Sequence, residues 1–164
     1  MTRRLLAALG LAAAVGCAAA TPGGAPGGAA TPAGVGRDTL RGTFVLEGSD
    51  PMPLPVLRTT DGRVALDDVP PAMGRLVQLD LWVRGAAESA GRFRVEEFLV
   101  RSAGGQRAWD GTVAAEAKGF ALRLSDGTLH VLRNAPSAFA GLVGRRIWVT
   151  ETPANTVASY GVIE

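Results

Sequence analysis

The chain has 164 residues, enough for one ordinary domain or two very small ones. Apolar residues make up 47% and charged residues 20%, which allows a packed core and excludes a wholly disordered chain. The formal net charge is +2, but Arg3 and Arg4 lie at the start and no acid precedes Asp38. The rest of the chain is neutral and lacks the overall basic charge of nucleic-acid-binding proteins, so we expect no nucleic-acid partner.

The amino terminus has the pattern of an export signal. Two arginines precede an uncharged stretch, residues 5–15, which is too short for a membrane-spanning helix of about 20 residues. The stretch ends in Ala14-Val-Gly-Cys17, which resembles the lipobox of bacterial lipoproteins. The resemblance implies removal of residues 1–16 and attachment of a diacylglyceryl group to Cys17. The alternative is an ordinary secretory signal cleaved near residues 18–20.

The segment after Cys17 is rich in Ala, Gly and Pro. Residues 18–36 carry no charge and no aromatic side chain, so they cannot bury enough surface to fold. We interpret residues 17–36 as a lipidated cysteine followed by a flexible tether with a reach of roughly 25 Å. The lipoprotein resemblance implies anchoring to the cell membrane. In a Gram-negative cell it implies the outer membrane, facing the periplasm, because Ala18 rather than Asp follows the cysteine.

The remaining chain repeats itself. Residues 56–66 align with residues 121–131 at an offset of 65, and both stretches contain Asp-Gly. Residues 76–83 align with residues 142–149 at an offset of 66, and each contains a Trp followed by Val. A fainter similarity links 42–47 to 111–116. This order predicts an internal duplication, with a first unit at 37–107 and a second at 108–164.

Each unit has the pattern of short β-strands. An Asp-Gly pair between apolar runs predicts a hairpin, because the Gly tolerates positive φ. The connectors at 67–74 and 133–141 contain Pro and have room for one helical turn at most. A slip in alternation at Glu96-Glu97 indicates a β-bulge. The expected strands of the first unit are 43–47, 56–60, 63–66, 77–83 and 92–100. In the second unit they are 111–116, 122–124, 128–132, the segment containing Trp148, and 157–163.

Five strands in this order resemble an OB-fold, a small five-stranded barrel. The resemblance covers about residues 39–101 and 111–164 and predicts an all-β protein with two such barrels in tandem. An SH3-like barrel in each unit, or one continuous sandwich, also fits the pattern.

The OB resemblance implies a ligand face on the second and third strands of each unit. Alternation points Arg58 and Arg63 outward in the first unit, and Arg123 and His130 in the second. Arginines there could bind a sulfate, phosphate or carboxylate. The alternative is that each pairs with an acid on the neighbouring strand.

The tryptophans form a second candidate set. Trp82 and Trp148 occupy matching positions, and their apolar neighbours take the inward face, so both indoles point outward. Each either forms a platform for a ligand or is covered by the other barrel or a terminal strand. Trp109 lies between the units, where it could act as a wedge.

The sequence carries no recognisable catalytic or metal motif. The chain has one Cys and one His, which excludes disulfide frameworks and zinc sites built from these residues. We expect His130 simply to face solvent, since no local spacing gives it the orienting partner and nucleophile of a general base. Asp67-Asp68 and Glu96-Glu97 lack calcium-loop spacing, and adjacent strand residues point to opposite faces. We therefore predict no catalytic residue, no metal and no cofactor.

These features predict a non-catalytic lipoprotein of the cell envelope that binds or scaffolds a protein or a glycan. The alternative is an envelope hydrolase or a metal-handling protein whose site carries no known motif. Single-stranded nucleic-acid binding would fit the barrel type, but the neutral charge and the export signal disfavour it.

Overall fold

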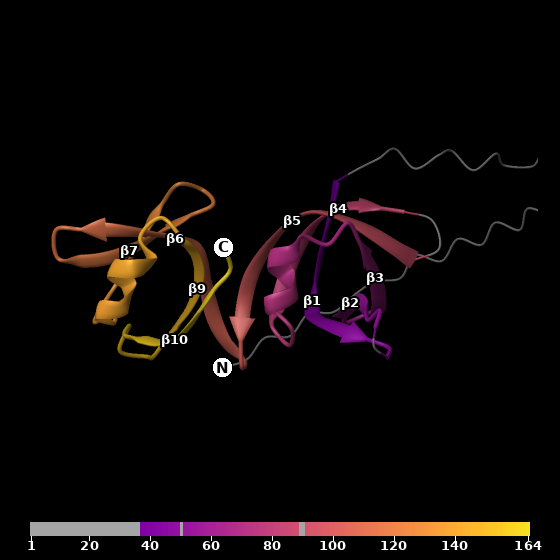
Figure 1. Ribbon diagram of the computed structural model, residues 1–164, viewed down its shortest axis with the longest axis horizontal. Coiled ribbons are helices and arrows are strands. Elements are labelled where there is room, and N and C mark those ends of the chain that lie inside the picture. The colour runs from indigo at the N-terminus through magenta and orange to yellow at the C-terminus, as the bar shows by residue number, and fades with distance from the viewer. Residues whose placement is uncertain (1–36, 50, 89–90) are drawn as a thin grey trace, which may run out of the picture. The chain divides into compact units, whose positions relative to one another are not determined.

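The computed structural model describes residues 37–49, 51–88 and 91–164 (Figure 1). The described chain is all-β, as predicted. Cys17, the predicted signal peptide and the tether lie outside the described residues. The elements are β1 (Arg37–Glu47), β2 (Leu54–Thr59), β3 (Gly62–Asp67), η1 (Pro71–Arg75), β4 (Asp80–Ala87), β5 (Arg92–Ala103), β6 (Gln106–Glu116), β7 (Gly119–Leu124), β8 (Leu129–Leu132), η3 (Ser137–Leu142), β9 (Arg146–Glu151) and β10 (Val157–Val162).

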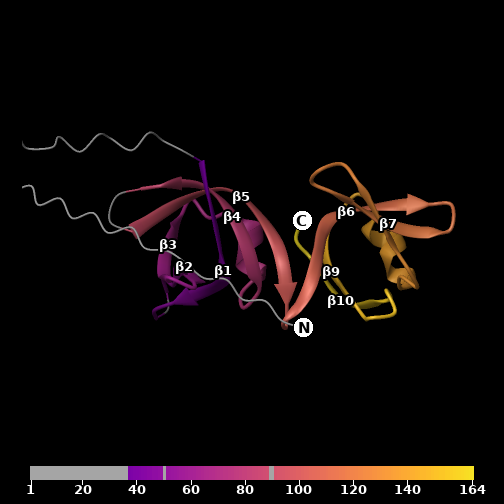
Figure 2. The ribbon, with the colours of Figure 1, turned by 180° about the vertical axis from the view of Figure 1, so that it is seen from behind.

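The strands β1–β5, here called the first half, pair in a ring. Strand β1 pairs antiparallel with β2 and β4, β2 pairs with β3, and β4 pairs with β5. The ring closes where β3 runs parallel to β5, with Leu66 opposite Phe93. All other pairings between named strands are antiparallel. The two opposite views show this half gathered apart from β7–β10, with β5 and β6 leading from one to the other (Figure 2).

The strands β6–β10, the second half, repeat this order. Strand β6 pairs with β7 and β9, β7 pairs with β8, and β9 pairs with β10. A parallel bridge between Arg133 and Thr156, just after β8 and just before β10, corresponds to the β3–β5 pairing. The first residues of β6 pair with β5, so the two halves share a continuous hairpin.

The pairing registers agree with the predicted internal alignment. Gly42 lies opposite Leu81, and Gly111 opposite Ile147. Both Asp-Gly pairs lie in hairpin turns, as predicted: the Thr59–Gly62 pair closes the first, and the backbone bond from the Leu124 N–H to the Thr128 carbonyl closes the second. The two halves therefore match in strand order, at an offset of 69 for β1 and β6, 65 for the hairpins and 66 for β4 and β9.

Several strand boundaries differ from the prediction. Strand β4 begins at Asp80 rather than 77, because Gln78 has a φ of 70° and interrupts the extended backbone. Strands β1 and β6 start well before 43 and 111 because their early residues pair with β4 and with β5 and β9. The predicted bulge in β5 is confirmed: Arg84 faces Glu97 and Gly85 faces Val95, which leaves Glu96 as the extra residue.

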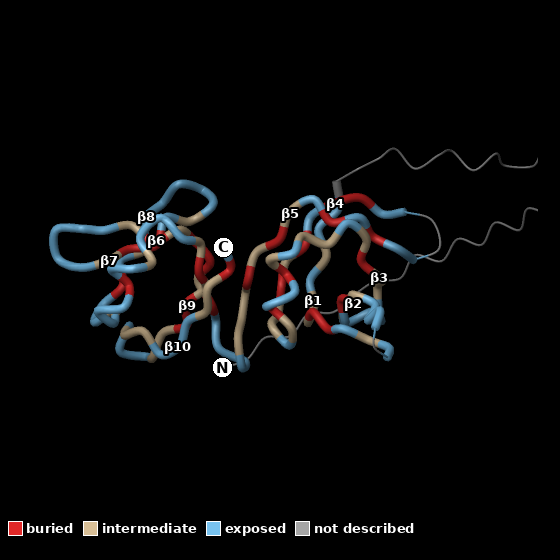
Figure 3. Tube along the Cα trace, viewed as in Figure 1, coloured by how far each residue is buried: buried red, intermediate tan, exposed pale blue. Residues whose placement is uncertain are grey.

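Each half has its own hydrophobic core, and buried residues alternate along the strands (Figure 3). Phe44, Leu57, Leu81 and Phe93 are among those that fill the first. Ala108 and Ile163 extend this first cluster into the second half. The second cluster comprises Val113, Leu122, Leu132, Phe139, Ile147 and Val149. Among the described residues no helix is long and apolar enough to cross a membrane.

Candidate functional site

The clearest surface feature of the first half surrounds Trp82 on β4. Its neighbours Leu81 and Val83 are buried in the core, so alternation leaves the half-buried indole on the outer face. Strands β1 and β5 flank β4 and each contributes an arginine to this indole. The Cζ of Arg41 lies 4.5 Å from the ring centroid, and the Cζ of Arg101 lies 4.0 Å from it. Both distances are in the range of cation–π contacts.

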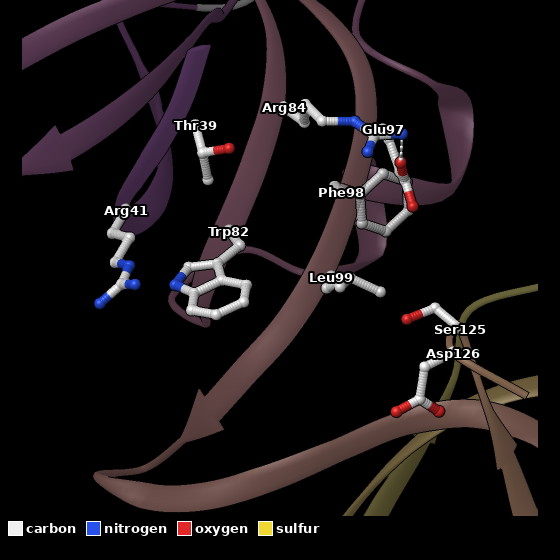
Figure 4. A pocket seen from close by; sticks show the side chains of 9 residues that line it. All are labelled: Thr39, Arg41, Trp82, Arg84, Glu97, Phe98, Leu99, Ser125 and Asp126. Carbon is white, nitrogen blue, oxygen red and sulfur yellow. Dashed lines mark ion pairs between the residues drawn. The ribbon is translucent and has the colours of Figure 1, made fainter. Parts of the chain in front are cut away.

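Three adjoining hollows share Trp82 in their walls, and together we call them the Trp82 groove. Their volumes are about 650, 550 and 270 Å³. The largest runs from Arg41 past Trp82 and Leu99 to Ser125 and Asp126, which face it from the β7–β8 turn (Figure 4). Ion-paired Arg84 and Glu97 also lie in its wall (Figure 4). The smallest extends from Trp82 to Arg107 and Trp109 on β6.

The acids in the wall of the groove already have partners. Asp80 accepts hydrogen bonds from the hydroxyls of Thr43 and Ser102. Oδ1 of Asp126 accepts bonds from the backbone N–H of Thr128 at 2.9 Å and its hydroxyl at 2.6 Å. These bonds, above all the one from the hydroxyl, lower the pKa of Asp126, so this carboxylate is charged at neutral pH.

Three arginines of the groove have no carboxylate partner among the described residues. Arg41 and Arg101 contact Trp82, and Arg107 lies with its Cζ 4.1 Å from the ring centroid of Trp109. Stacking on an indole leaves the edge of a guanidinium, with its N–H donors, free for other groups. The groove therefore offers several positive charges that the described chain itself does not neutralise.

The matching surface of the second half is occupied by the chain itself. Asp110 lies opposite Trp148, as Arg41 lies opposite Trp82, and Arg146 corresponds to Asp80. Asp110 and Arg146 form an ion pair, with Nε to Oδ1 at 2.8 Å. Asp110 also accepts a bond from the Val100 N–H at 2.8 Å, and Arg146 donates to the Phe98 carbonyl at 2.6 Å. The backbone of β5 thus lies on this face.

Trp148 itself is covered. Its half-buried ring packs against the first core cluster, and a Cβ on Gly161 of β10 would lie 2.6 Å from its Nε1. The two matching tryptophans therefore have different surroundings: arginines beside Trp82, and protein packing around Trp148.

The predicted arginines behave differently from one another. Arg58 donates to Oε1 of Glu47 from Nε at 3.1 Å and Nη2 at 3.0 Å, and Arg63 donates to Oε2 at 3.2 Å. Both pair with an acid, as in the alternative weighed from the sequence, but Glu47 lies on the strand next to that of Arg58 and two strands away from that of Arg63. Arg58 still lies in the wall of one hollow of the groove. Arg123 is exposed and lines a separate hollow of about 220 Å³.

The expectation that His130 simply faces solvent is wrong. Its side chain is 23% exposed, its Nε2 lies 2.9 Å from Oε2 of Glu151, and its ring stacks on Trp109 at 4.0 Å. Trp109 Nε1 donates to the same oxygen at 2.9 Å. Trp109 therefore belongs to a cluster joining β6, β8 and β9 rather than acting as a wedge between the units. The other oxygen, Oε1 of Glu151, is buried without a hydrogen-bond partner in the described structure.

Sequence reasoning missed Arg41, Arg101 and Arg107. Arg41 contacts Trp82 only because β1 begins early and pairs with β4, and this pairing joins residues far apart in the sequence. The sequence held one clue to Arg101: alternation along β5 places Leu99 and Arg101 on one face. The register, with Leu99 opposite Trp82, shows that this is the face of Trp82.

In each acidic pair considered as a calcium ligand, one carboxylate pairs with an arginine. Asp67 accepts from Arg92, with Nε to Oδ2 at 2.6 Å, and this bond lowers the pKa of Asp67. Glu97 pairs with Arg84. Across the described ranges, no group of three or more His, Cys, Asp and Glu residues could hold a metal ion.

Comparisons of the chain with protein-family models, with curated proteins and with solved structures found no match.

Proposed function

We propose that this protein is a non-catalytic, lipid-anchored binding module of the cell envelope, built from two OB-like barrels, and that the Trp82 groove binds its protein or glycan partner. The observation that carries the proposal is the pair of arginines that make cation–π contacts with Trp82, without carboxylate partners in the described chain, in an open groove. Such a surface recognises a ligand by charge and hydrogen bonds and needs no reactive group.

The pairing order supports the OB-like interpretation. In each half the first strand pairs with the second and fourth, and a parallel contact joins the third to the fifth. That arrangement is expected of a small five-stranded Greek-key barrel. The 3-10 helices η1 and η3 take the place of a longer helix between the third and fourth strands.

The comparison of the two halves supports the first half as the binding half. On the second half, Asp110, Arg146 and Trp148 already hold the backbone of β5 and pack against protein. On the first half, the matching residues Asp80 and Trp82 border an open hollow. This face thus packs against β5 in the second half and is open to a ligand in the first half.

Photo-crosslinking in cells that make the protein tests this function. A diazirine-bearing residue in place of Ser125, which is exposed in the groove wall, should form an adduct with an envelope protein or glycan, identified by mass spectrometry. The matched control is the same residue in place of Lys118, which is exposed in the β6–β7 turn. We expect the Ser125 adduct to disappear when Arg41→Gln and Arg101→Gln are added. Equal adducts at both positions, or none at Ser125, would contradict the proposal.

The lipid anchor has its own test. Cys17→Ser removes the thiol that the lipobox resemblance assigns to lipidation. We expect the variant to lose all label from a fatty-acid probe and to keep its signal peptide. Retention of the label by the serine variant would contradict lipidation at Cys17.

A further inference from the structure

We propose that the ligand of the Trp82 groove is an acidic polysaccharide, recognised by its carboxylates at Arg41, Arg101 and Arg107 and by its hydroxyls at the β7–β8 turn. This inference rests on the proposed function and names the chemical class of its ligand.

The arrangement of the arginines favours a polymer with repeated negative charges. Arg41 and Arg101 come from the strands on either side of β4 and both contact Trp82. Arg107 contacts Trp109 in the adjoining hollow, whose wall also contains Arg101 and Trp82. Successive charged positions along one groove match a chain that carries an acidic group on successive units.

The tryptophans fix these charges in place. A guanidinium stacked on an indole has lost much of its side-chain freedom before a ligand arrives, so less entropy is lost when it binds. Each guanidinium can then donate two parallel hydrogen bonds to a carboxylate. The stacked arginines are in this sense preorganised for planar anionic groups.

The other end of the groove distinguishes a polysaccharide from a nucleic acid. The Asp126 carboxylate lies there beside Ser125, in the wall of the same hollow as Arg41 and Trp82. A carboxylate accepts hydrogen bonds from hydroxyls, which a polysaccharide carries on every unit and the backbone of a DNA strand lacks. The guanidinium groups of Arg41 and Arg101 also lie over the Trp82 ring, where a nucleobase would have to stack.

Binding of the full-length chain to polygalacturonate, measured by calorimetry at a fixed ionic strength near 0.1 M, tests the inference. Neutral dextran and a single-stranded thymidine oligonucleotide serve as competing ligand classes. We expect binding to polygalacturonate and not to dextran. Tighter binding to the oligonucleotide than to polygalacturonate, or equal binding to dextran, would overturn the inference.

Variants then locate the site. Arg41→Gln and Arg101→Gln should each weaken polygalacturonate binding by about tenfold or more, the value of one lost charge-assisted interaction. Arg75→Gln and Arg133→Gln are matched controls, because both arginines are exposed and neither lines the described hollows. We expect these controls to bind within about twofold of the wild type. An equal loss in controls and groove variants would overturn the site, and circular dichroism checks that every variant is folded.

Asp126→Asn separates sugar recognition from simple charge attraction. Removing a carboxylate makes the groove more positive, so plain electrostatics predicts tighter binding. Loss of an acceptor for sugar hydroxyls predicts weaker binding, by roughly threefold. Tighter binding by this variant would overturn the polysaccharide assignment. If the Ser125 adduct forms but polygalacturonate does not bind, the ligand class is wrong and the proposed function stands; if neither is seen, both fail.

Discussion

Two glycines determine how closely the strands approach one another at matching points of the two halves. A Cβ on Gly42 of β1 would lie 2.2 Å from the carbonyl oxygen of Arg58, and a Cβ on Gly111 of β6 would lie 2.6 Å from that of Arg123. Any side chain would push neighbouring backbone aside at either position. This close approach gives a physical reason for the glycine at the start of both 42–47 and 111–116.

We predict that Gly42→Ala and Gly111→Ala each lower the free energy of unfolding by about 1–3 kcal/mol, because the added methyl group overlaps backbone. Urea unfolding measures the change. Gly74→Ala is the control, since a Cβ there meets nothing within 4 Å. A variant at Gly42 as stable as the Gly74 variant would contradict the close approach.

At the level of elements, β4 and β9 show how one local pattern leads to two environments. Both strands place buried residues on either side of an outward tryptophan. Trp148 is covered by the first core cluster and Gly161, whereas Trp82 lies beside two arginines in a groove. Alternation predicts the direction of each indole, but only the surrounding strands determine what covers it.

This difference predicts unequal stability losses. Trp148→Ala removes an aromatic ring packed against a core and should lower the free energy of unfolding by about 3 kcal/mol. Trp82→Ala removes mainly contacts with partly exposed arginines and should lower it by about 1 kcal/mol. Denaturant unfolding of the two variants, side by side, measures this. A larger loss of unfolding free energy for Trp82→Ala than for Trp148→Ala would contradict this prediction.

The hairpins and the bulge show which elements could be predicted from the sequence. The Asp-Gly turns, the inward faces of β2 and β7 and the bulge at Glu96 are all local features, and each was predicted. The start of β4 was not, because the positive φ of Gln78 has no signature in the apolar alternation around it. Because Gln78 interrupts the strand, Val77 and Leu79 pack partly buried against the first core cluster from outside β4.

At the scale of the whole described unit, the ion pair of Asp110 and Arg146 connects the two halves. Asp110 and Arg146 of the second half bind the backbone of β5 in the first, beside the shared hairpin of β5 and β6. The Asp110 side chain is only 4% exposed, so its charge depends on Arg146 and the Val100 N–H for compensation. Ala108 and Ile163 add apolar contacts across the same region.

Asp110→Ala should therefore lower the free energy of unfolding by about 3 kcal/mol, since it leaves the half-buried charge of Arg146 without its carboxylate and the Val100 N–H without its acceptor. Glu47→Ala is the control. It removes the partner of Arg58 and Arg63, whose side chains are 62% and 77% exposed, and should cost less than about 1 kcal/mol. Equal urea midpoints for the two variants would argue against a structural role for the Asp110–Arg146 pair.

The sequence by itself determined the all-β class, the two hairpins, the matching order of the strands and the outward direction of Trp82 and Trp148. These features follow from turn chemistry and a period of two, which act over a few residues. Only the tertiary structure decided that Arg41 lies beside Trp82, that Glu151 binds His130 and that β5 covers the second copy of the outer face. Each of these contacts joins strands far apart in the chain, and such pairing depends on the register of the whole sheet rather than on any local pattern.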